Sequence, residues 1–102
     1  MSEYDYNQLV YIMQQKNFCL FKISNYKFNI IKNEHGTFGE FFDYLITITI
    51  DPKTNYIIYW AISDTGTSTE EYINKVESQL NTIFNSKKIL FTEACLSIAN
   101  IL

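Results

Sequence analysis

The spacing of apolar residues in the first part of the chain predicts an amphipathic helix. Four of them recur at the spacing of one helical face: Tyr6, Leu9, Val10 and Met13. Ser2 with Asp5 three residues later is typical of a helix start, because the serine hydroxyl can accept a hydrogen bond from a backbone N–H of the first turn. We therefore expect a helix that begins near Ser2 and ends near Lys16 and Asn17.

The pattern then changes to the alternation that is typical of strands. One run covers residues 18–24 and a second covers 26–32, with Ser24 and Asn25 as the candidate turn of a hairpin, although one long bent strand fits the same pattern. Residues 33–36 have turn chemistry. A third strand follows over residues 38–50, with Gly39 as a candidate bulge and the face of its threonines the more exposed one.

A polar stretch at residues 51–55 predicts the clearest hairpin of the chain, since Pro52 is placed to begin a type I turn. The strand after it, residues 56–62, is apolar at nearly every position. We expect this strand to be central and covered on both faces, and to end at Asp64.

The last third of the chain predicts helices. Ser68 and Glu71 fit a capping box, and the helix that they begin carries one apolar face and runs to about Ser86. The tail is ambiguous: Ile89 to Phe91 suits a short strand, whereas a helix can begin at Thr92. We prefer a strand followed by a helix, with a strand alone or a helix alone left open.

These elements predict one α+β domain over residues 1–102, in the order α-β-β-β-β-α-β-α. The sheet is expected to be mainly antiparallel and four- or five-stranded, with the helices packed on one face.

The charge of the chain argues against nucleic acid as a partner. Eleven acidic residues oppose eight lysines, which gives a net charge of -3, and arginine is absent. Arginine is the usual residue for phosphate and guanine recognition, and a net negative charge opposes binding to a nucleic-acid backbone. The same composition, rich in Ile, Asn and Lys, is typical of an AT-rich coding sequence, as found in low-GC bacteria and phages.

We expect a cytoplasmic protein without a membrane partner. The start of the chain is polar and acidic, and the longest apolar run, residues 56–62, is far shorter than the roughly 20 residues of a membrane span. Cys19 and Cys95 have apolar neighbours, which predicts two reduced thiols in the core.

No catalytic or metal-binding motif is present, and we expect neither a cofactor nor an enzyme. His35 is the only histidine and falls in a predicted surface turn. Neither cysteine has the spacing of a zinc ligand, and the three glycines form no phosphate-binding motif. Paired carboxylates could serve glycoside hydrolysis, but carboxylates at a helix start are already favoured by the helix dipole.

The segment around Phe41 is the best candidate for a binding surface. Alternation backwards from Ile46 places Phe41 beside charge on the outer side, unless a helix or the tail covers it. A second acidic group is expected at the start of the second helix. Together the candidate partner-binding residues are Glu40, Phe41, Asp43, Asp64, Glu70 and Glu71.

A small acidic domain without arginine is suited to covering a basic site on another protein, because complementary charge steers association. Bacterial immunity proteins and phage-encoded inhibitors of host defence are similar in size and charge. We therefore expect a protein-binding inhibitor, most simply an immunity protein that neutralises a toxin or effector. A secretion or assembly chaperone, which would form a homodimer, and a small enzyme or ligand-binding domain remain alternatives.

Overall fold

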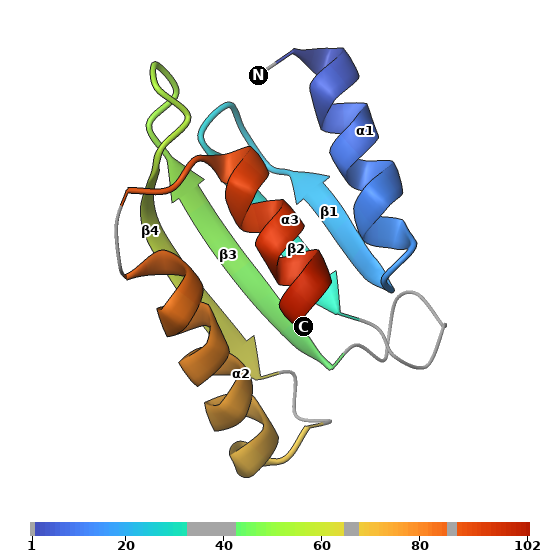
Figure 1. Cartoon of the computed structure of the whole chain (residues 1–102), viewed down its shortest axis with the longest axis vertical. Coiled ribbons are helices and arrows are strands. Elements are labelled where there is room, and N and C mark those ends of the chain that lie inside the picture. Colours follow the sequence, from blue (N-terminus) through green and yellow to red (C-terminus); the bar gives the residue numbers. More distant parts are fainter. Residues whose placement is uncertain (1, 33–42, 65–67, 86–87) are drawn as a thin grey trace.

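In the part of the chain that the structure describes, the fold combines one antiparallel sheet with three helices, as expected for the predicted α+β class. The computed structural model describes residues 2–32, 43–64, 68–85 and 88–102, apart from the side chain of Asp64. Over these residues the order of elements is α-β-β-β-β-α-α (Figure 1).

The first helix, α1 (Glu3–Gln14), forms where the apolar spacing predicts it. The Ser2 hydroxyl accepts a hydrogen bond of 3.1 Å from the Asp5 backbone N–H, which confirms the predicted helix start. Leu9 and Met13 are buried. The chain then reverses at Asn17, whose φ of 64° is in the left-handed region that asparagine tolerates.

The sheet is a meander of four strands in the order β1-β2-β3-β4. The strands are β1 (Phe18–Lys22), β2 (Lys27–Lys32), β3 (Tyr44–Ile50) and β4 (Ile57–Asp64). Each pairs antiparallel with the next, so the first two runs form a hairpin and not one bent strand. The core side of β3 is fully buried, whereas Thr47 and Thr49 are half-buried on the other side, as predicted.

The prediction that the strand after the polar turn is central is wrong. β4 is the last strand of the sheet, and Tyr59 is 59% exposed. Its register shifts against β3 between Thr49 and Ile50, so that Thr49 faces Tyr59 and Ile50 faces Ile57. Ile58 is therefore the extra residue, at 66% exposure. The apolar residues at nearly every position of β4 therefore reflect its irregular position at the edge of the sheet, and not burial of both of its faces.

The second helix, α2 (Glu70–Phe84), begins one residue later than predicted. Thr69, not Ser68, caps it, with the threonine hydroxyl accepting a 3.2 Å hydrogen bond from the Tyr72 N–H. The Ser68 hydroxyl instead donates to the Asp43 carbonyl at 2.7 Å. The predicted capping box is therefore replaced by a threonine cap and a link from Ser68 to the start of β3.

The tail contains a helix but no full fifth strand. Tyr56 forms an isolated bridge with Leu90, and the Ile57 N–H donates to the Ile89 carbonyl at 3.0 Å. Helix α3 (Phe91–Ile101) begins directly afterwards and buries Ala94, Cys95 and Ile98. The predicted strand thus amounts to one bridge that anchors the start of α3 to the edge of β4.

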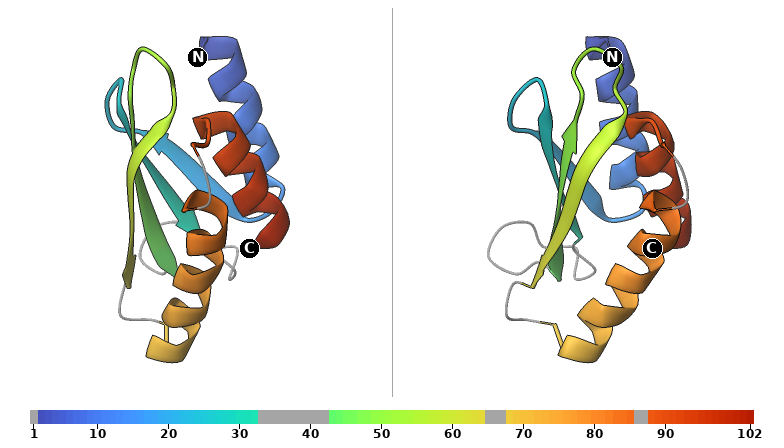
Figure 2. Two further views of the ribbon diagram at one scale, coloured as in Figure 1. Left: turned by 60° about the vertical axis from the view of Figure 1, so that its left-hand side comes forward. Right: turned by 90° about the vertical axis from the view of Figure 1, so that its left-hand side faces the viewer.

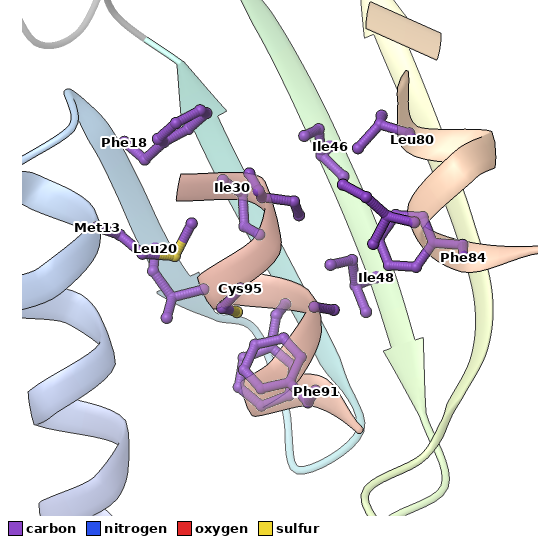
Figure 3. Packing of buried hydrophobic residues seen from close by; sticks show 14 of the residues in the cluster. Met13, Phe18, Leu20, Ile30, Ile46, Ile48, Leu80, Phe84, Phe91 and Cys95 are labelled. Carbon is purple, nitrogen blue, oxygen red and sulfur yellow. The ribbon is translucent and has the colours of Figure 1, made fainter. Parts of the chain in front are cut away.

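All three helices lie on one side of the sheet (Figure 2). The core fills the space between the two layers, and Figure 3 shows side chains from β1, β2 and β3 meeting those of α2 and α3. The Phe28 and Phe91 rings stack with centroids 4.1 Å apart, which fixes α3 over the middle of the sheet. At the β4 side, Trp60 and Phe84 stack at 5.2 Å and hold the end of α2.

The opposite face of the sheet, here called the open face, is not covered by any described helix (Figure 2). Strand register places Cys19, Ile31 and Leu45 in one row of this face. Cys19 is half-buried and Cys95 is fully buried, and both are free thiols. The prediction of two core cysteines is therefore correct for Cys95 and wrong for Cys19.

Candidate functional site

Part of the predicted binding surface lies outside the described residues. His35, Glu40 and Phe41 fall in residues 33–42, so neither the predicted turn histidine nor the aromatic and acidic pair is placed by the structure. The remaining four predicted residues are Asp43, Asp64, Glu70 and Glu71.

Asp43 does not have the exposure that the sequence pattern suggested. It is 7% exposed. Its backbone N–H donates to the Lys32 carbonyl at 2.8 Å, and its carbonyl accepts the bond from Ser68. Asp43 therefore joins β2, β3 and the start of α2, and we leave it out of the proposed contact surface because a buried side chain offers a partner little area.

Asp64, Glu70 and Glu71 lie at one end of the molecule, here called the acidic end. Asp64 is the last residue of β4 and the strand partner of Tyr44, which directly follows Asp43 in the sequence. The hydrogen bond from Ser68 to Asp43 brings the start of α2 to the same end (Figure 1). Glu70 and Glu71 are both exposed in the first turn of α2.

A second surface, the β4 edge, was not found from the sequence. It consists of Tyr56, Ile58 and Tyr59, which are 37%, 66% and 59% exposed. Beside it lies a shallow hollow of about 260 Å³ lined by residues 57–60 with Phe84 and Asn85. The register shift that exposes Ile58 carries no clear signal in an apolar run, so periodicity alone could not have found this surface.

The described residues contain no group of three histidine, cysteine or acidic side chains that could hold a metal ion. A hollow of about 300 Å³ between α1 and β1 is lined by Val10, Gln14, Cys19, Leu20 and Phe21. Burial raises the pKa of the Cys19 thiol, so this lining residue is held in its less reactive protonated form.

Comparisons with protein-family models, with curated proteins and with solved structures gave no match to this chain. None of the helices among the described residues has the length and apolar character that crossing a membrane requires. The acidic end and the β4 edge are therefore the two surfaces of the described residues that bear on function.

Proposed function

We propose that this protein is a small protein-binding inhibitor, of the kind represented by immunity proteins, and that its acidic end covers a basic site on a toxin or effector. The observation that carries the proposal is the gathering of Asp64, Glu70 and Glu71 at one end of the fold, in a chain with a net charge of -3. The exposed carboxylates of Glu70 and Glu71 would steer a basic partner and fix its orientation.

We add two residues that shortly precede Asp43 in the sequence to the proposed contact surface. Glu40 and Phe41 precede Asp43 in the chain, and Asp43 lies at the acidic end. An aromatic ring beside carboxylates would supply the apolar contact that charge alone does not give. Glu40 and Phe41 therefore belong to the proposed contact surface together with Asp64, Glu70 and Glu71.

The test must separate binding from helix stability, because carboxylates in the first turn of a helix also favour the helix dipole. Glu93 provides the matched control: it is an exposed first-turn glutamate of α3, and α3 begins at the other end of the fold, where the Phe91 N–H donates to the Asn55 carbonyl. The double variant Glu70→Lys/Glu71→Lys and the control Glu93→Lys both replace first-turn glutamates by lysine. Both therefore disturb the same kind of favourable interaction between a carboxylate and the helix dipole.

Tagged protein and both variants are used to capture partners from the native lysate at moderate salt. We expect one stoichiometric basic protein to bind the wild type and Glu93→Lys, to be lost from Glu70→Lys/Glu71→Lys, and to dissociate at high salt. Equal retention by all three proteins would remove the acidic end from the interface. Capture of no basic partner would contradict the inhibitor proposal itself.

A further inference from the structure

We infer that the β4 edge is a pairing surface for a second copy of this chain, so that two sheets join antiparallel through their β4 strands. This inference goes beyond the proposed inhibitor function and does not depend on it. The two edges of the sheet differ in how they are protected against pairing with another strand.

The β1 edge is protected. Helix α1 lies beside β1 (Figure 1). The Tyr6 hydroxyl of this helix donates a 3.3 Å hydrogen bond to the Leu20 carbonyl. β1 also ends on the exposed Lys22, and a lysine on an edge strand opposes pairing with another chain.

Among the residues that the structure describes, none gives the β4 edge comparable protection after its first residue. The Ile57 N–H is already engaged, because it donates to the Ile89 carbonyl. In the right-hand view of Figure 2, no described helix or strand lies in front of the rest of β4. Residues 58–63 contain neither a charge nor a proline. Ile58 and Tyr59 add large exposed apolar side chains to this edge. Such an edge is a template for another strand.

Symmetry favours a second copy as the occupant. A two-fold axis pairs identical strands antiparallel and uses the same surface twice. Opposite residues of an antiparallel pair share a face. On β4, Tyr59, Ala61 and Ser63 share the open face, since they are the partners of Thr49, Thr47 and Leu45. A two-fold axis through Ala61 places Tyr59 of one copy opposite Ser63 of the other. The pairing then extends over residues 58–64 of both copies.

The charges at the two ends of β4 fit this register. Asp64 is the only charged residue of β4. Lys88 lies at the other end, with its ammonium 5.7 Å from the centroid of the Tyr56 ring. With the axis through Ala61, Asp64 of one copy is opposite Ile58 of the other, two residues from Tyr56. The dimer therefore brings Asp64 and Lys88 into proximity twice, whereas a parallel arrangement would place like charges together.

Sedimentation equilibrium over a concentration series tests the inference. We expect a reversible dimer for the wild type and at least about a tenfold weaker association for Ile58→Lys, because a lysine would be placed in the joined sheet. The matched control is Ile23→Lys, since Ile23 is 54% exposed and directly follows β1. Far-ultraviolet circular dichroism confirms that each variant is folded.

A wild type that remains monomeric up to about 1 mM would overturn the inference. A dimer that survives Ile58→Lys, or that Ile23→Lys weakens equally, would also overturn it, because another surface would then be responsible. The register has its own test: Asp64→Lys should weaken the dimer, and Asp64→Lys/Lys88→Asp should restore it. Failure of the double variant to restore association would exclude the antiparallel register through Ala61.

Discussion

The Lys32 ammonium lies 4.2 Å from the centroid of the Phe18 ring and donates a 3.0 Å hydrogen bond to the Lys16 carbonyl. Lys32 is only 5% exposed, so these contacts compensate a cation that burial would otherwise disfavour. Because Lys16 follows α1 and Phe18 begins β1, one side chain from β2 holds the connection between the first helix and the sheet.

Replacing Lys32 by alanine should therefore lower the free energy of unfolding by about 2 kcal/mol, through loss of the cation–π contact and of the donor to a carbonyl. Lys27→Ala, at the exposed start of β2, is the control and should change stability by less than about 0.5 kcal/mol. Urea unfolding measures both. Equal effects of the two substitutions would contradict the role assigned to Lys32.

The cap of α2 gives a second prediction. Thr69→Ala should cost about 1 kcal/mol in unfolding free energy, because the Tyr72 N–H loses its acceptor. Thr69→Ser should recover most of this loss, since the hydroxyl is kept. An unchanged stability of Thr69→Ala in denaturant unfolding would show that the helix is capped by another residue.

The single tryptophan provides a direct readout of the packing between α2 and β4. Phe84→Ala should lower the free energy of unfolding by about 3 kcal/mol and shift the emission of Trp60 to longer wavelength, because water gains access to the indole ring. Phe21→Ala removes a 37% exposed ring from the open face and should leave the emission unchanged. Identical spectra for wild type and Phe84→Ala would contradict the observed stacking.

Burial of Cys95 predicts a loss of stability at alkaline pH. Burial raises the pKa of this thiol above its ordinary value of 9.0. The native state therefore keeps the proton while the unfolded state loses it, so the unfolded state binds fewer protons and stability falls as the pH rises above 9.0. Below that pH the contribution of Cys95 is fully present.

The effect approaches about 1.4 kcal/mol per pH unit for one such group. Guanidinium unfolding between about pH 7 and about pH 10 should show a smaller alkaline decline for Cys95→Ala than for the wild type. The change of unfolding free energy with pH is measured within each protein. The constant loss of stability from the cavity that the substitution leaves therefore does not affect the comparison. Burial also raises the pKa of Cys19, but this thiol is only half-buried, so Cys19→Ala should reduce the alkaline decline less than Cys95→Ala does. Parallel declines in wild type and Cys95→Ala would contradict the prediction.

Local sequence patterns predicted most of the helices, strands and turns, because the interactions that start and end them join residues a few positions apart. The apolar spacing in α1 and the hydroxyl of Ser2 define that helix within a few residues. The polar turn at residues 51–55 defines the β3–β4 hairpin in the same way, with the Asp51 carboxylate accepting from the Lys53 N–H at 2.9 Å. The cap of α2 was misplaced by one residue because Ser68 and Thr69 carry the same chemical group.

The candidate surfaces were less predictable, since exposure depends on neighbours far along the chain. Asp43 fits an outward position by alternation, yet it is buried where β2, β3 and the start of α2 meet. Ile58 and Tyr59 are in a run that resembles a buried strand, and only the order of the strands makes them an edge.

The sequence by itself determined the class of fold, the faces of the helices and the side of β3 that enters the core, because periodicity and turn chemistry act over a few residues. Tertiary structure decided which strand lies at the edge, which carboxylates are exposed and where the tail packs. These follow from contacts such as Phe28 with Phe91 and Trp60 with Phe84, which join residues distant in the chain and leave no periodic signal in it.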